Sequence, residues 1–166
     1  MAKTARSGWD RLAAIRATFD AFGVVRSKNQ RQMHECMNQA IAQQIWRDGE
    51  FEAQLDRIMR HFGVSTLRED LMMIAPRREG KSMAVAMAAA NYAMNVETLS
   101  QAIFSTGRRA SRKLHELIFR FLSRLPGAKA RIAVHNIETM ELVFGDADRR
   151  EINSYPSKVQ VTGGIF

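Results

Sequence analysis

Apolar residues recur every three or four positions through the first third of the chain, which is the spacing of one helix face. Three segments share this spacing, with faces formed by Leu12, Ile15, Phe19 and Phe22, by Met33, Met37, Ile41 and Ile45, and by Phe51, Leu55, Ile58 and Phe62. Ser7 and Ser27 stand where a capping hydroxyl is needed, and Gly23 and Gly63 stand where two of these helices should end. Residues 1–64 are therefore predicted to form a helical amino-terminal region.

The pattern changes after residue 64. An apolar run at residues 71–75 stops at Pro76 and predicts a strand, and the alanine- and methionine-rich residues 82–94 predict a helix. Residues 97–105 predict a second, parallel strand, followed by an amphipathic helix that ends at Pro126. Further strands are expected at residues 131–134, 140–144, 150–155 and 159–161. The sequence thus predicts an α/β fold, with a partial parallel sheet in residues 65–166.

A phosphate-binding motif lies between the predicted strand at 71–75 and the helix after it. Residues 75–82 fit the pattern G-x-x-x-x-G-K-[ST], except that Ala75 replaces the first glycine. Backbone N–H groups can surround a phosphate only where no side chain obstructs them, which explains Gly80. Lys81 is then expected to reach the β- and γ-phosphates, and Ser82 to give its hydroxyl to Mg²⁺. The alternative is a basic surface turn without a ligand.

This motif resembles the P-loop of large terminase subunits, the ATPases that drive viral DNA into capsids in the herpesvirus and tailed-phage lineage. The matching residues are Ala75, Pro76, Arg77, Arg78, Glu79, Gly80, Lys81 and Ser82. Three shorter stretches agree in order, namely Lys28-Asn29-Gln30, Phe104-Ser105-Thr106-Gly107-Arg108-Arg109 and Tyr155-Pro156-Ser157-Lys158-Val159. The resemblance spans about residues 28–160 and implies a P-loop NTPase-like core in residues 65–166.

The resemblance also implies ligands and partners. ATP and Mg²⁺ would be the cofactors, with Gln30 contacting adenine, although the glutamines near it could equally form a solvated helix face. Duplex DNA, a portal and other terminase subunits would be the partners, and a homo-oligomeric ring would be the assembly. Arg77 or Arg78 is expected to stabilise charge on the γ-phosphate, the alternatives being local ion pairs or contact with DNA.

The net charge of +8 is concentrated in two blocks, and the second lies in residues 107–131, with eight Lys or Arg against one Glu. Arg108, Arg109, Arg112 and Lys113 begin this block at the expected carboxyl edge of the sheet. They are predicted to bind duplex DNA through its phosphates, without sequence preference. A solvated helix face is the alternative.

A P-loop motor also needs an acidic residue at the end of an apolar strand to hold Mg²⁺. No apolar run in this sequence ends in Asp-Glu. Residues 142–146 come nearest, but Gly145 interrupts them, and a turn explains Asp146 and Asp148 without chemistry. In the resembling family the acidic strand follows the Tyr-Pro-Ser-Lys segment. We therefore expect the amino-terminal part of a packaging ATPase that binds nucleotide with little turnover. A helicase-like remodelling ATPase and a non-catalytic basic DNA-binding module are the alternatives.

Composition limits the remaining possibilities. A chain of 166 residues with 46% hydrophobic residues suits one globular domain. No apolar run is long enough to span a membrane, and no signal peptide begins the sequence. The single cysteine, Cys36, cannot form an internal disulfide and is expected in the core. His34 and His61 lack neighbours at metal-ligand spacing and are interpreted as structural. An intracellular, reducing compartment is therefore expected.

Overall fold

The computed structural model describes residues 6–105 and 107–156, and of Arg108 it describes the backbone only. In this part of the chain the helices are α1 (Gly8–Ala21), α2 (Lys28–Ala40), α3 (Ala42–Ile45), α4 (Glu50–Phe62), α5 (Lys81–Asn95), α6 (Arg108–Leu122) and the short 3-10 helix η1 (Lys129–Arg131). The strands are β1 (Ser100–Ser105), β2 (Ile132–His135), β3 (Thr139–Phe144) and β4 (Asp148–Pro156).

The caps predicted for the amino-terminal helices are confirmed. Ser7 and Ser27 each accept a bond from the backbone three residues on, and in each case the side chain at that third position, Asp10 or Gln30, bonds back to the cap residue. Such capping boxes satisfy two backbone donors that a helix start would otherwise leave open. Gly63 ends α4 with a φ of 68°, a left-handed conformation that glycine adopts without strain.

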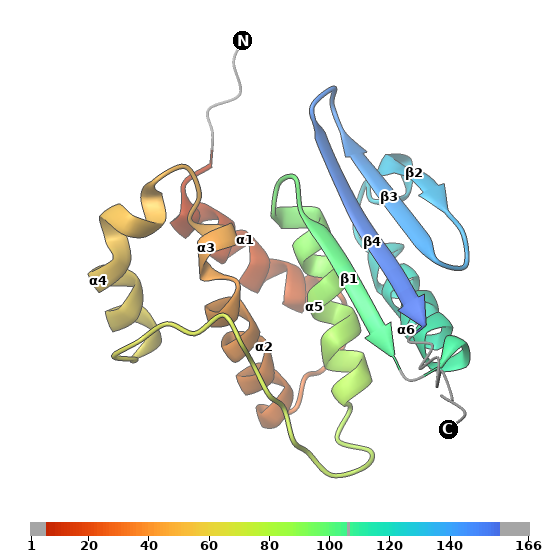
Figure 1. Ribbon diagram of the computed structural model, residues 1–166, viewed down its shortest axis with the longest axis horizontal. Helices are drawn as coiled ribbons and strands as arrows, with labels where there is room; N and C mark the ends of the chain where they lie inside the picture. The colour runs from red at the N-terminus through yellow and green to blue at the C-terminus, as the bar shows by residue number, and fades with distance from the viewer. Residues whose placement is uncertain (1–5, 106, 157–166) are drawn as a thin grey trace, which may run out of the picture.

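The sheet is mixed, with the strand order β1-β4-β3-β2. β1 and β4 are parallel, whereas β4 with β3 and β3 with β2 are antiparallel. The fold is therefore a combination of helices with a partly parallel sheet, as the α/β prediction requires at this coarse level. Since α5 and β1 run in opposite directions, the start of α5 lies at the same end of the molecule as the carboxyl ends of β1 and β4 (Figure 1).

Helix α5 is the centre of the molecule. It contacts α1, α2, α6 and β4 (Figure 1), and its alanines from Ala86 to Ala90 are nearly all inaccessible to solvent. Small side chains let several elements approach one helix closely. One hydrophobic core accordingly includes residues of both proposed regions, such as Phe19 and Trp46 on one side and Ile118 and Met140 on the other. The boundary between regions 1–64 and 65–166 stays a prediction.

Both tryptophans of the chain lie in the helical region. Trp46 is fully buried, and its ring lies edge-on to Trp9 with centroids 5.0 Å apart. Trp9 connects to α4, because its Nε1 donates to Gln54 Oε1 at 2.5 Å and the Arg57 guanidinium lies 4.5 Å from the ring centroid. This cluster attaches α4 to α1 and α3.

The strand predicted at residues 71–75 is wrong. These residues form no strand and pair with none of the described strands, and Met72 and Ile74 are 85% and 90% exposed. An apolar run becomes a strand only when a neighbouring strand satisfies its backbone groups. In Figure 1 the segment runs past the helices rather than beside β1, and β1 takes its parallel partner from β4 instead.

The helix expected to carry Met33, Met37, Ile41 and Ile45 is divided at Ile41 into α2 and α3, and the buried residues of α2 are Gln30, His34 and Asn38. Most of the other expected elements differ only at their ends. Helix α5 begins at Lys81, with Gly80 as its N-cap, so that Ser82 is its second residue rather than its first. β1 begins at Ser100 instead of residue 97, after a short turn. The strand expected at 159–161, Thr106 and residues 157–159 of the last resembling stretch lie outside the described residues. None of the described helices is long and apolar enough to span a membrane.

Candidate functional site

The loop at residues 75–80 turns sharply into helix α5. Gly80 has a φ of 76° and Arg78 a φ of 73°, so two left-handed residues produce the turn. No side chain caps the helix, and the first bond that closes it is donated by Ala84 N to Gly80 O. The backbone N–H groups of Lys81, Ser82 and Met83 therefore point outward without helical acceptors. This is the arrangement of donors that an anion can bind.

The side chain of Lys81 folds back over the loop. Its Nζ donates to the carbonyl oxygen of Ala75 and, at 2.8 Å, to that of Pro76. These two bonds connect the end of the Lys81 side chain to the beginning of the loop, so that residues 75–81 form a closed ring. A positive charge is thus held at the loop, next to the free N–H groups of the helix start.

Helix α2 packs against this loop. The Gln30 amide nitrogen lies 2.4 Å from the point where a Cβ on Gly80 would be. The Gln30 amide oxygen accepts from Ser27 N at 3.0 Å, and Asn29 Nδ2 donates to Glu79 Oε2 at 3.3 Å. The structure therefore brings Asn29 and Gln30 beside residues 79–80, 50 positions away, as expected if the upstream glutamine belongs to the same site.

His34, which the sequence analysis treated only as structural, fastens α2 to the first turn of α5. It is fully buried, its Nε2 lies 3.0 Å from the carbonyl oxygen of Ala84, and its Nδ1 lies 3.2 Å from Arg26. Arg26 has no acceptor role, so Nδ1 must be the unprotonated nitrogen and Nε2 must carry the proton. Burial lowers the pKa of His34 to about 4, although the bond to the Ala84 carbonyl acts to raise this pKa. Neutral His34 thus holds α2 against the first turn of α5, next to the loop at residues 75–80.

The remaining residues of the predicted site are exposed. Arg77, Arg78 and Ser82 are open to solvent, and neither arginine forms an ion pair with another described residue. Among the residues that the structure describes, no group of three or more His, Cys, Asp or Glu side chains could hold a metal ion. The side chains present therefore fit a phosphate group, whereas Mg²⁺ would find only the Ser82 hydroxyl and would depend on the nucleotide for other oxygens.

The predicted DNA-binding residues lie at the start of α6, after the carboxyl end of β1. Arg109 and Arg112 line an open hollow of about 800 Å³ together with Asn136, Ile137 and Glu138. Arg112 also donates to Glu116 at 3.1 Å, so part of its charge is neutralised within the helix. Lys113 is exposed. Arg108 begins the helix, and its side chain is outside the description.

The nearest acidic candidates do not belong to this site. Asp146 is exposed in the turn between β3 and β4, at the end of the sheet opposite the carboxyl ends of β1 and β4. Asp148 pairs with buried Arg150 and accepts from Thr98 N at 2.8 Å. Burial acts to raise the pKa of Asp148, but the bonds from Arg150 and Thr98 outweigh it and hold this pKa below its usual value. Both aspartates are explained by the hairpin, as the sequence analysis expected.

Comparisons with known proteins do not add a family. The chain matches no family model, and no curated protein matches it. The function is therefore argued from the site alone.

Proposed function

We propose that residues 75–82 bind the phosphates of a nucleoside triphosphate, ATP with Mg²⁺, and that the chain is part of a DNA-packaging ATPase of the terminase type. The observation that supports this most directly is the ring closed by the Lys81 ammonium on the carbonyls of Ala75 and Pro76 at the uncapped start of α5. Free N–H groups, the helix dipole and one fixed cation favour the same ligand charge.

The other residues have defined roles in this proposal. Gly80 lets the backbone approach the phosphates, and the Ser82 hydroxyl contacts the magnesium ion. Arg77 and Arg78, both exposed, neutralise charge on the γ-phosphate. Gln30, which lies beside Gly80, contacts the adenine in this proposal, and its amide oxygen either keeps its bond to Ser27 N or exchanges it for the nucleotide.

Duplex DNA is the proposed partner of the second basic block. Arg109 and Arg112 line the same hollow at the carboxyl end of β1, which is the end of the sheet where α5 begins (Figure 1). Nucleotide and DNA would therefore be bound at one end of the molecule. A portal, other terminase subunits and a homo-oligomeric ring belong to the same proposal.

Calorimetric titration with Mg-ATP tests the nucleotide site. Lys81→Ala should weaken binding at least about tenfold, because one charge-assisted contact to phosphate contributes more than about 1.4 kcal/mol. Lys129→Ala, an exposed lysine in η1, is the matched control and should bind as the wild type does. Equal affinity of Lys81→Ala and wild type, or no heat from either at millimolar nucleotide, would contradict the proposal.

A further inference from the structure

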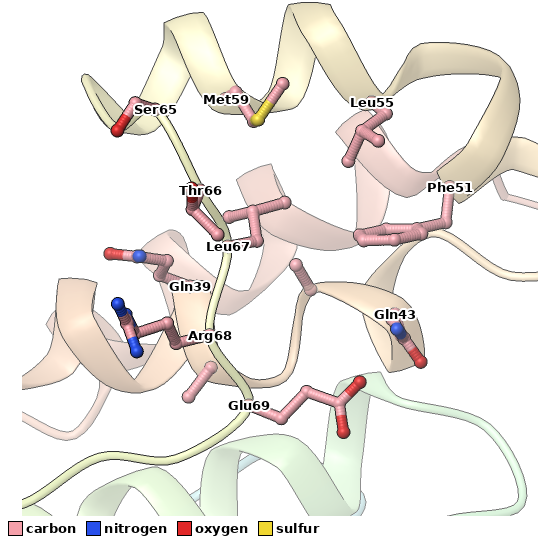
Figure 2. Close-up of a pocket in the computed structure, with 12 residues that line it drawn as sticks. Gln39, Gln43, Phe51, Leu55, Met59, Ser65, Thr66, Leu67, Arg68 and Glu69 are labelled. Carbon is pink, nitrogen blue, oxygen red and sulfur yellow. The ribbon is translucent and has the colours of Figure 1, made fainter.

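A small, mostly apolar pocket lies beneath helix α4 (Figure 2). It has a volume of about 270 Å³ between α4, the end of α2 and residues 65–69. Phe51, Leu55 and Met59, four residues apart on α4, point into it, and Leu67 faces them from the loop (Figure 2). Phe51 and Leu67 also pack against the hydrophobic core, whereas Leu55 is 36% exposed at the pocket.

The same chain carries an unpaired apolar segment directly after this pocket. Residues 70–76, which we call the arm, form no helix or strand, and Met72 and Ile74 are among the most exposed large apolar side chains of the described residues. Within the described part of the chain, the arm takes part in no backbone–backbone hydrogen bond. Apolar side chains and open backbone groups of this kind mark a segment that pairs or docks elsewhere.

Opposite charges lie beside the two features, in addition to the basic Arg57 and Arg60 of α4 and Arg68 of the pocket wall. Glu52 and Asp56 flank Leu55 on α4, are exposed and form no ion pair with a described residue. Arg77 and Arg78 follow the arm, are exposed and are equally unpaired. An arm placed in the pocket with its basic end toward α4 would bring these opposite charges together, which favours encounter and fixes orientation.

The arm of one molecule is poorly placed to fill its own pocket. Glu69, at the start of the arm, forms part of the pocket wall. The Ala75 and Pro76 carbonyls at its other end are held by Lys81. Figure 1 shows the segment leading away from α4 toward the start of α5. Turning Ile74 back into the pocket would break the ring that Lys81 closes, whereas an arm from another molecule meets no such restraint.

We propose that the pocket under α4 receives Met72 and Ile74 from the arm of a second copy of this chain. The contact joins two different surfaces, so it is either exchanged reciprocally in a dimer or repeated head to tail in a larger assembly. Its apolar part, Met72 and Ile74 in the pocket, uses no residue that contacts nucleotide in the function proposed above, and it gives the proposed homo-oligomer a specific contact.

Sedimentation equilibrium over a concentration series tests the proposal on the full chain. The wild type should self-associate, and Met72→Ser/Ile74→Ser should raise the dissociation constant roughly 100-fold, because two apolar side chains lose their burial. Both side chains are exposed in the monomer, so the variant should fold normally. Val25→Ser replaces another apolar side chain, 96% exposed, and should leave self-association unchanged.

A second variant tests the pocket itself. Leu55→Gln, at a position that is 36% exposed, should weaken self-association as the arm variant does. Mixed together, the arm and pocket variants should form heterodimers, because one intact arm still meets one intact pocket. A wild type that remains monomeric, or an arm variant that associates like the wild type, overturns the proposal. Normal association of Leu55→Gln also overturns it, since the arm would then dock elsewhere, for example on the edge of β1. The arm variant should still bind Mg-ATP as the wild type does. Titrating it with Mg-ATP therefore tests the phosphate site independently of self-association.

Discussion

At the residue scale, Gly80 is required for two separate reasons. Its φ of 76° belongs to the left-handed region that other residues adopt with strain. Its missing Cβ also leaves the space in which the Gln30 amide lies. The motif explains only a third requirement, close approach of a phosphate, and so the contact between residues 30 and 80 could not be deduced from spacing. It depends on how α2 packs on α5.

Gly80→Ala should therefore cost more stability than an ordinary left-handed glycine. Gly23→Ala is the matched control, because Gly23 has a φ of 67° and nothing within 4 Å of the added Cβ. We expect about 1 kcal/mol for Gly23→Ala and about 2 kcal/mol for Gly80→Ala in urea unfolding, because the end of the Gln30 side chain must move aside and lose its bond to Ser27 N. Equal losses would mean that Gln30 moves aside freely and does not shape the loop.

The buried imidazole of His34 predicts a pH dependence. Its pKa is about 4 in the folded protein, against 6.5 for an unperturbed histidine. Between these values the unfolded chain binds the extra proton, so the free energy of unfolding should fall as pH drops from 6.5 to 4, by about 3 kcal/mol in total. Aspartates with lowered pKa values, such as Asp148, act only below about pH 4.

Proton NMR of the His34 ring separates it from the other histidines. Burial also lowers the pKa values of His61 and His115, so they contribute in the same direction. The His34 resonance should keep its neutral shift until about pH 4. Titration near pH 6.5 would show that the His34 ring is not buried in solution.

At the element scale, α2 links the helical region to the phosphate loop. Its capping box places Gln30 beside Gly80, its Asn29 meets Glu79, and its His34 fixes the first turn of α5. The sequence predicted this helix and its cap, but the apolar face of Met33 and Met37 is only partly buried, and the fully covered face is the polar one of Gln30, His34 and Asn38. It could not show that α2 packs on the loop, because apolar spacing defines a face but not the element that covers it.

Two capping serines provide a matched pair of variants. Ser7→Ala and Ser27→Ala should each cost about 1 kcal/mol in urea unfolding, because each removes one capping box. Both variants keep the backbone bond from Ser27 N to Gln30 Oε1, so both should bind Mg-ATP as the wild type does. Gln30→Ala removes the side-chain amide beside Gly80 and should weaken Mg-ATP binding by roughly threefold to tenfold. Wild-type nucleotide affinity of Gln30→Ala would show that Gln30 has no part in the site.

At the scale of the whole molecule, the sequence predicted the order of elements and the mixed architecture, but it placed the sheet one strand too early. The error at residues 71–75 has a physical cause. Strand formation depends on a partner, and β1 is paired by β4, 50 residues further on, which no local pattern reveals. The turn into α5 at Gly80 and Lys81 was located nearly correctly from local spacing, whereas phosphate binding by this turn stays a prediction.

Binding of duplex DNA by the basic block at residues 107–131 is expected to depend on salt. Duplex affinity should fall with salt with a log–log slope of roughly −3 to −5, because only about three to five contacts to phosphate are available around α6. Replacing Arg108, Arg109 and Arg112 by alanine should flatten this slope and weaken all DNA sequences alike. Fluorescence anisotropy across a salt series measures both effects.

Two results bear on that prediction. Since Arg112 already pairs with Glu116, Arg112→Ala alone should change the slope less than Arg109→Ala does. If the triple variant keeps the wild-type slope, the block around α6 is a solvated face. Any DNA would then be bound by basic residues near the amino terminus.

The neighbouring tryptophans Trp9 and Trp46 make the protein's intrinsic fluorescence a local signal. Both fluorophores lie at the attachment of α4, and no tryptophan occurs in residues 47–166. Trp46, shielded from water, should emit at short wavelength, while Trp9 should be sensitive to the cation of Arg57 above its ring. A shift of the emission to longer wavelength would therefore report that α4 has detached while the sheet is still folded. Nucleotide should leave the spectrum unchanged, but occupation of the space under α4 should alter it.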